Sequence, residues 1–190
     1  DIGVVKMEVM RNYEPKPGFL KQVRDITRKN GIILIFDECT SAFRRTFGGL
    51  HKYYNVKPDM AVFGKALGNG YPITAVLGTN NVMKHVQNTF ISSTFWTERV
   101  GPVAALKTLS IMEKNKSWII IDKVGLQIRK KLKILAKKHN LNINFFGLPA
   151  LTTFNLKGFD EKFVKTFLSQ EFLKQGILGS NTIYVSLAHT

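Results

Sequence analysis

A chain of 190 residues with 44% hydrophobic and 11% aromatic side chains can bury a core, which excludes an intrinsically disordered protein. No apolar run approaches the roughly 20 residues that a membrane span needs, so no membrane segment is expected. The 28 basic and 13 acidic side chains give a net charge of +15, but the basic residues are spread along the chain, which favours solvated helix faces over a nucleic-acid surface.

The first half of the chain alternates strand and helix patterns. A strand is predicted over 3–7, and an amphipathic helix over 18–29, where Asn30-Gly31 stops it. Three apolar runs are too short for typical helices and are interpreted as strands buried on both faces, the mark of a parallel sheet: 32–36, 60–63 and 73–78. This alternation predicts a doubly wound α/β fold.

The second half predicts a smaller α+β lobe. Helices are expected over 98–114, capped by Thr97, and over 119–139. Strands over 143–158 and 183–187 surround a helix over 160–175. A boundary near Asn115 to Ser117 divides the chain into residues 1–116, part of a large domain, and 117–190, part of a small C-terminal domain.

Two charged side chains stand directly after predicted strands. Asp37 follows the run over 32–36, and Lys65 follows the run over 60–63. If those strands are parallel, both side chains lie at the same edge of the sheet, where α/β folds collect their chemistry. A lysine before the glycine-rich turn GNGYP can be desolvated, which lowers its pKa and lets the neutral amine form a Schiff base. A carboxylate across the site would then hold a protonated pyridine nitrogen.

Plainer interpretations compete with this one. ILIFDE resembles a Walker B strand, but the phosphate loop that it requires is missing upstream, and Asp37 could simply cap a helix. The four histidines and Cys39 lack metal-ligand spacing, so no metal site is predicted. Cys39, the single cysteine, is interpreted as a buried small residue and favours a reducing, cytoplasmic compartment. The basic run from Arg129 to His139 is interpreted as a solvated helix face.

Three segments then resemble one family. IILIFDECTSAFR at 32–44, MAVFGKALGNGYPITAVLG at 60–78 and STFWTERVGPVAAL at 93–106 resemble class III pyridoxal-phosphate aminotransferases, with glutamate-1-semialdehyde 2,1-aminomutases the most similar in appearance. EPKPGFLKQVRDITRKNG at 14–31 resembles the family's segment before its aspartate strand. The resemblance implies a fold-type I transferase fold, mostly parallel with helices on both faces, and the cofactor pyridoxal 5′-phosphate.

The resemblance also implies residue roles. Lys65 is similar to the lysine that carries the cofactor as a Schiff base, and Asp37 to the partner of the pyridine nitrogen. Cys39 stands where the family packs a small apolar residue on the ring. Thr94, with Ser93 as a weaker companion, is similar to the hydroxyl that reaches the cofactor phosphate of the neighbouring subunit, which implies a homodimer with shared active sites. An amino-acid or amino-aldehyde or keto substrate is expected, with no nucleic-acid or membrane partner.

The chain also departs from the family. Ala42 stands where glycine is common, and Glu98-Arg99 replaces a frequent asparagine–proline pair, so aminotransferase and aminomutase chemistry both stay open. Family members are roughly twice as long, and the chain resembles their C-terminal half. Two alternatives therefore remain beside the enzyme: an inactive remnant that needs an absent N-terminal half, and a basic polyanion-binding module.

Overall fold

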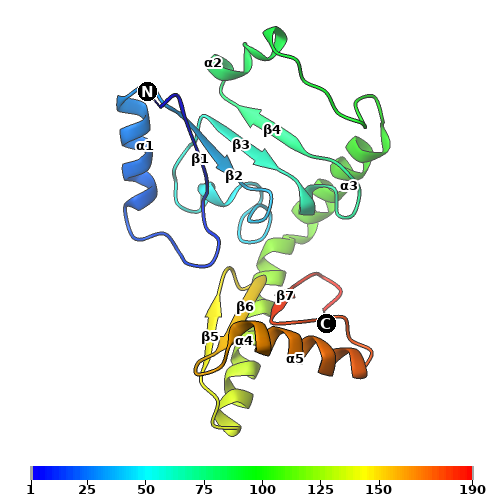
Figure 1. Cartoon of the computed structure of the whole chain (residues 1–190). Helices are drawn as coiled ribbons and strands as arrows, with labels where there is room; N and C mark the ends of the chain where they lie inside the picture. The colour runs from blue at the N-terminus through cyan, green and yellow to red at the C-terminus, as the bar shows by residue number, and fades with distance from the viewer. Residues whose placement is uncertain (1, 190) are drawn as a thin grey trace. The chain divides into compact units, whose positions relative to one another are not determined.

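The computed structural model describes residues 2–189, which form two compact units (Figure 1). Unit 1 holds the residues up to Met10 together with Pro15–Trp118. Unit 2 holds Arg11–Glu14 and the residues from Ile119 onward. None of the helices within residues 2–189 is long and apolar enough to cross a membrane.

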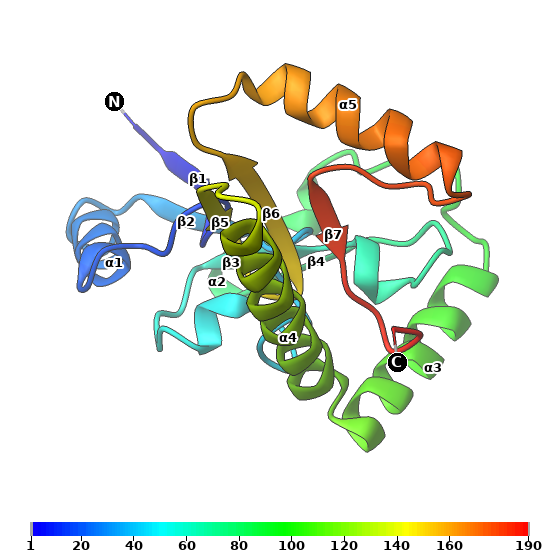
Figure 2. The ribbon, with the colours of Figure 1, turned by 90° about the horizontal axis from the view of Figure 1, so that it is seen from below.

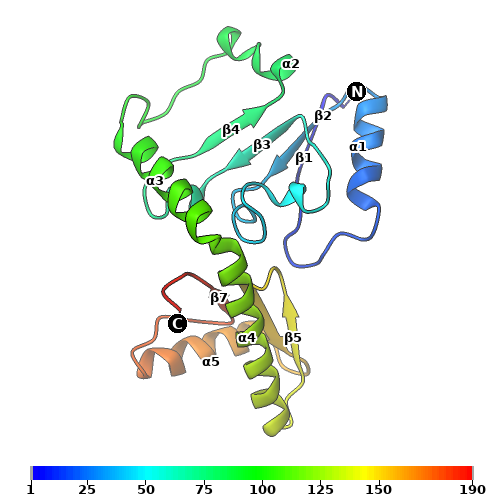
Figure 3. The ribbon, with the colours of Figure 1, turned by 180° about the vertical axis from the view of Figure 1, so that it is seen from behind.

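A four-stranded sheet organises unit 1. Its order along the sheet follows the chain: β1 (Val4–Glu8), β2 (Ile33–Asp37), β3 (Met60–Phe63) and β4 (Ala75–Gly78). β1, β2 and β3 are parallel, which confirms the prediction of a mostly parallel α/β sheet. In Figure 3 the arrows of β2 and β3 point the same way, whereas that of β4 points back.

The last strand of this sheet contradicts the sequence prediction. β4 is antiparallel to β3, and three of its four residues are exposed, so it is not a strand buried on both faces. The connection from Phe63 to Ala75 holds only the short 3₁₀ helix η2 (Lys65–Leu67) and a tight turn. A parallel return needs a longer crossover, usually a full helix, so this short connection brings the chain back antiparallel.

Five helical segments complete unit 1. They are α1 (Phe19–Lys29), η1 (Leu50–Lys52), α2 (Asn80–Met83), η3 (Val86–Asn88) and α3 (Val100–Asn115). Asp59 ties α1 to the sheet, because its Oδ2 accepts hydrogen bonds from Arg24 Nη1 at 2.6 Å and from the Leu34 N–H at 2.8 Å. The predicted Thr97 cap of α3 is wrong: the Glu98 carboxylate accepts from the N–H groups of Val100 and Gly101 instead.

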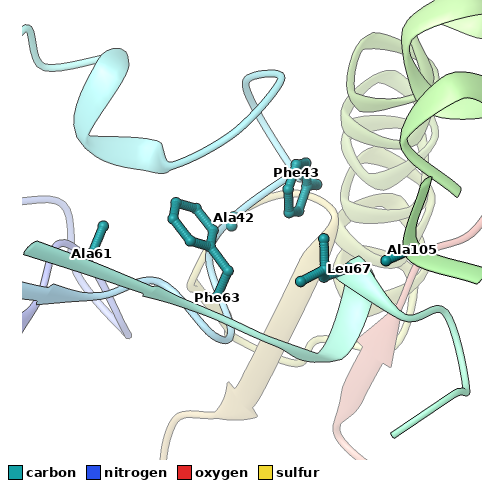
Figure 4. Packing of buried hydrophobic residues seen from close by; sticks show 6 residues of the cluster. All are labelled: Ala42, Phe43, Ala61, Phe63, Leu67 and Ala105. Carbon is teal, nitrogen blue, oxygen red and sulfur yellow. The ribbon is translucent and has the colours of Figure 1, made fainter. Parts of the chain in front are cut away.

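One hydrophobic cluster of unit 1 joins the segment that follows β2 to β3, η2 and α3. Figure 4 shows the cluster formed by Ala42, Phe43, Ala61, Phe63, Leu67 and Ala105. The rings of Phe43 and Phe63 lie 6.0 Å apart, which joins the post-β2 segment to β3. Ala42 is 2% exposed and has a negative φ, so a glycine is not required at that position.

Unit 2 packs helices against an antiparallel sheet of order β5-β6-β7. Its elements are α4 (Ser117–Lys138, whose first two residues belong to unit 1), β5 (Ile143–Phe146), β6 (Leu151–Leu156), α5 (Glu161–Lys174) and β7 (Thr182–Tyr184), with α4 and β6 visible in Figure 2. The region 143–158, in which strands were predicted, holds β5 and β6. Gly147, with φ of 73°, precedes the turn between them, which the Leu151 N–H closes on the Leu148 carbonyl at 2.9 Å.

Arg129 corrects the prediction of a wholly solvated basic face on α4. Six basic residues of that run are exposed as predicted: Lys130, Lys131, Lys133, Lys137, Lys138 and His139. Arg129 is half-buried and donates to the Thr152 hydroxyl at 2.7 Å and to three carbonyl oxygens of the β5–β6 turn. It therefore joins α4 to the sheet of unit 2.

Candidate active site

The parallel pairing of β2 and β3 places Asp37 and Lys65 at one edge of the sheet. Asp37 is the last residue of β2 and lies level with Val62 of β3. Lys65 comes three residues after Val62, just beyond the end of β3. Both side chains therefore follow the carboxyl ends of neighbouring parallel strands, which confirms the geometric prediction made from the two apolar runs.

Lys65 adopts a backbone conformation that a lysine rarely takes. Its φ is 47°, in the left-handed region, at the start of η2. Non-glycine residues in this region cost free energy and gather at functional sites, where the surrounding structure imposes them. The Lys65 side chain is exposed, so the predicted desolvation of its amine is not found in this structure. The side chain turns to Thr40, and its Nζ donates a hydrogen bond of 2.5 Å to Thr40 Oγ1.

Asp37 is held as a carboxylate by two donors. Its Oδ2 pairs with Lys6 Nζ of β1 at 3.0 Å, and its Oδ1 accepts from the Cys39 N–H at 3.1 Å. The hydrogen bond from Lys6 lowers the pKa of Asp37, those from Cys39 add to this effect, and burial opposes it. The side chain is 25% exposed, so the anion is accessible from the sheet edge. Asp37 accepts from the main chain of a turn, which excludes the interpretation that it caps a helix.

Cys39 lies between these two groups. A Cβ placed on Gly64, the residue before Lys65, would sit 3.4 Å from Cys39 Sγ, so the thiol packs against the backbone that carries the lysine. Burial raises the pKa of Cys39, and the neighbouring Asp37 carboxylate raises it further. A thiol with a raised pKa is a poor nucleophile. The prediction that Cys39 is a buried residue is wrong, because its side chain is half-buried.

A buried carboxylate fastens the segment that contains Cys39 and Thr40. Glu38 is 0% exposed and holds the Glu38 loop, residues 38–51, by four hydrogen bonds. It accepts from Ser41 Oγ at 2.6 Å, from Leu50 N at 2.8 Å, and from N and Nδ1 of His51 at 2.9 and 2.8 Å. These bonds join the two ends of the loop, so they hold the segment in which Thr40 accepts a hydrogen bond from Lys65 Nζ.

Ser93 and Thr94 lie apart from this cluster. Both are exposed residues of the loop between η3 and α3. The Ser93 hydroxyl accepts from the Phe95 N–H at 3.3 Å, and within residues 2–189 neither Ser93 nor Thr94 hydrogen-bonds to Asp37 or Lys65. A single chain thus assembles Asp37, Cys39 and Lys65 but leaves the two hydroxyl residues facing outward.

Two members of the cluster were missed by sequence reasoning. Lys6 lies in β1 at the edge of the sheet and is 60% exposed, and exposed lysines are common on edge strands, so the sequence VVKME carried no signal of its pairing with Asp37. Thr40 carries no such signal either, because its contact with Lys65 depends on the path of the Glu38 loop. Across the part of the chain that the structure describes, no group of three or more metal-ligating side chains is present.

Comparison with known proteins identifies the family. The family model described as "Aminotransferase class-III" matches residues 11–189. The chain belongs to the class-III aminotransferase family. The resemblance found in the three motifs is thereby confirmed, and so is pyridoxal 5′-phosphate as the cofactor of the family.

The relatives of this class-III chain include both aminotransferases and aminomutases. The chain is 37% identical over 136 residues to a 3-aminobutyryl-CoA aminotransferase of Cloacimonas acidaminovorans, covering 71% of this chain and 33% of that protein. It is 34% identical over 171 residues to a glutamate-1-semialdehyde 2,1-aminomutase of Thermodesulfovibrio yellowstonii, covering 87% and 40%. The chain therefore spans well under half the length of these relatives.

Solved structures share the fold of this class-III chain. The FumI protein of Sphingopyxis sp. MTA144, in its PLP internal aldimine form, superposes with a TM-score of 0.92 at 24% identity, covering 100% of this chain and 48% of that one. An ornithine aminotransferase of Plasmodium yoelii gives a TM-score of 0.78 at 23% identity, covering 98% and 52%. At these identities the likeness concerns the fold, and it confirms the predicted fold-type I transferase architecture.

Proposed function

We propose that the chain takes part in pyridoxal-phosphate-dependent amino-group transfer, as an aminotransferase or an aminomutase, with Lys65 as the residue that binds the cofactor covalently. One observation carries this proposal: an amine and an ionised carboxylate follow neighbouring parallel strands at one sheet edge, with a small thiol between them. Lys65 thus fits the aldehyde of the cofactor, Asp37 its ring nitrogen, and Cys39 the face of its ring. When bound, the cofactor supplies an electron sink for the substrate carbon next to the amine.

Each of these residues has a distinct task. Asp37 pairs with the protonated ring nitrogen, and the same pairing keeps the carboxylate ionised. Once the substrate's amino group has taken its place on the cofactor, the freed Lys65 Nζ would remove a proton from the substrate α-carbon as a general base and later return a proton as a general acid. Thr40 Oγ1, which already accepts from Lys65 Nζ, holds the amine in place during these transfers. Cys39 packs against the ring.

The loop that carries Thr94 and Ser93 supports a dimeric form of the proposal. Both residues are exposed, and Phe95 and Trp96 beside them are 50% and 65% exposed, so this loop carries apolar surface that a neighbouring subunit would cover. In the proposed homodimer these hydroxyls bind the cofactor phosphate in the neighbouring subunit's site. A small amino-acid, amino-aldehyde or keto substrate and a cytoplasmic location belong to the same proposal.

Borohydride trapping tests the role of Lys65. The full chain is incubated with pyridoxal 5′-phosphate, reduced with borohydride and digested, and the modified lysine is mapped by mass spectrometry. We expect modification at Lys65 above all other lysines, its loss in Lys65→Ala, and its retention in Lys57→Ala, which removes an exposed lysine of unit 1 away from the edge. Equal modification of many surface lysines would contradict the proposal, and a folded chain with no modification would support the remnant alternative.

A further inference from the structure

The ion pair between Lys6 and Asp37 occupies the group that the proposed function reserves for the cofactor. Lys6 Nζ lies 3.0 Å from Asp37 Oδ2, and the other carboxylate oxygen accepts from the Cys39 N–H. Both oxygens of Asp37 are thus engaged by the chain itself. A ring nitrogen that paired with Oδ2 would therefore have to displace the Lys6 ammonium from that oxygen.

We propose that Lys6 is a positioning residue that holds Asp37 Oδ2 until the cofactor's ring nitrogen displaces it, so that Lys6 opposes the binding of that nitrogen. The inference rests on the proposed role of Asp37. Lys6 supports the apo site by keeping the carboxylate ionised and aimed along the sheet edge. Lys6 opposes cofactor binding because its ammonium and the protonated ring nitrogen compete for the same oxygen and repel each other.

The exposure of Lys6 explains why the displacement is feasible. Its side chain is 60% exposed, whereas that of Asp37 is 25% exposed, so the ammonium can withdraw into water while the carboxylate stays. The Cys39 N–H keeps its bond to Oδ1, so the carboxylate retains its orientation throughout the exchange.

Comparing two ligands across protein variants isolates the influence of Lys6 on the binding of the ring nitrogen. Affinities of the full chain are measured by fluorescence titration for pyridoxamine 5′-phosphate and for its 1-deaza analogue, in which CH replaces the ring nitrogen. Neither ligand has an aldehyde, so Lys65 forms no covalent bond with either. Both carry the same phosphate, so the general attraction of Lys6 for an anion cancels in the ratio of the two dissociation constants.

The wild-type chain is expected to prefer the ligand that has the ring nitrogen. Lys6→Met should increase this preference about two- to fivefold, since an exposed ion pair has to be broken only in the wild type. Lys6→Gln serves as a second neutral variant, and Lys6→Arg keeps the cation and should leave the preference within about twofold of wild type. Raising the salt concentration should reduce the difference in ligand preference between wild type and Lys6→Met, because salt screens exposed charges.

The outcomes separate this inference from the proposed function. A wild-type preference that stays unchanged or falls in both neutral variants overturns the role of Lys6 while leaving that of Asp37 intact. A wild-type chain with no preference for the ring nitrogen, joined with no trapping at Lys65, overturns the proposed function itself. An increased preference in both neutral variants but not in Lys6→Arg supports the inference.

Discussion

Replacing Glu38 by glutamine is expected to destabilise unit 1 strongly, although the two side chains have nearly the same shape. Glu38 is 0% exposed and accepts four hydrogen bonds through two oxygens. Glutamine offers one oxygen, so two of the four donors would face an NH₂ group that cannot accept. The Leu50 and His51 backbone N–H groups cannot turn away, because they belong to the first turn of η1.

In either orientation of the amide one backbone N–H loses its acceptor, whereas the side-chain partner on the same side, the Ser41 hydroxyl or His51 Nδ1, can reverse its role and accept from the NH₂ group. A hydrogen bond to a charged group contributes about 1.5–3 kcal/mol, so the free energy of unfolding should fall by about 1.5–3 kcal/mol. With a urea m-value of about 2 kcal/mol/M, the unfolding midpoint should drop by roughly 0.8–1.5 M. Glu113→Gln, an exposed substitution in α3 of the same unit, should change stability by less than about 0.5 kcal/mol.

Tryptophan fluorescence reads out this unit selectively. Trp96 and Trp118, the two tryptophans of the chain, both belong to unit 1. The Trp118 ring lies 5.4 Å from that of Phe47, which is in the Glu38 loop. In a Trp96→Phe background, urea unfolding followed by Trp118 emission reports on the loop that Glu38 fastens.

The contribution of Glu38 to stability also depends on pH in a predictable direction. Burial alone would raise the pKa of Glu38, but hydrogen bonds from His51, Ser41 and the backbone outweigh it and hold the pKa below its ordinary value of 4.5. The carboxylate therefore contributes stability that is present above pH 4.5 and is lost as the pH falls through the folded-state pKa. The difference in urea unfolding midpoint between wild type and Glu38→Gln should therefore become smaller in acid. Equal midpoints at pH 7, or a gap that does not shrink in acid, would refute the reasoning.

Three further changes test other contacts. Thr40→Val removes the acceptor of Lys65 Nζ and should slow covalent attachment of the cofactor at Lys65 about tenfold, measured by timed borohydride trapping, with little change in stability. Gly125→Ala should destabilise unit 2 by about 1–3 kcal/mol or more in thermal unfolding, because its methyl group would collide with the Pro149 carbonyl. Arg129→Met should cost unit 2 about 2–4 kcal/mol in urea unfolding, since it removes four hydrogen bonds from one partly buried guanidinium.

Matched controls keep these tests sharp. Lys130→Met alters an exposed neighbour of Arg129 on α4 and should leave stability within about 0.5 kcal/mol of wild type. Wild-type stability in Arg129→Met would contradict its role as a link between α4 and the sheet. An unchanged trapping rate in Thr40→Val would show that the hydroxyl does not hold the amine, and wild-type unfolding of Gly125→Ala would show that the helix can shift away from Pro149.

The sequence by itself determined most of the strands and helices and the sheet edge at which the site lies. Short apolar runs predict strands of a parallel sheet, although in this structure β2 and β3 bury one face fully and the other only partly. A residue that follows such a strand lies at the carboxyl edge of the sheet. Asp37 and Lys65 were therefore placed correctly without coordinates. The three motifs were equally sufficient for the family, because they place the same residue types at the same separations.

Only the tertiary structure decided the direction of β4 and the partners of the site. The run over 73–78 has the composition of a buried strand, yet the short connection after Lys65 reverses the chain, and connection geometry is not encoded in apolar periodicity. The contacts of Asp37 with Lys6 and of Lys65 with Thr40 join residues 31 and 25 positions apart. Such pairs depend on strand register and on the path of the Glu38 loop, which arise from packing of the whole unit and not from any local pattern.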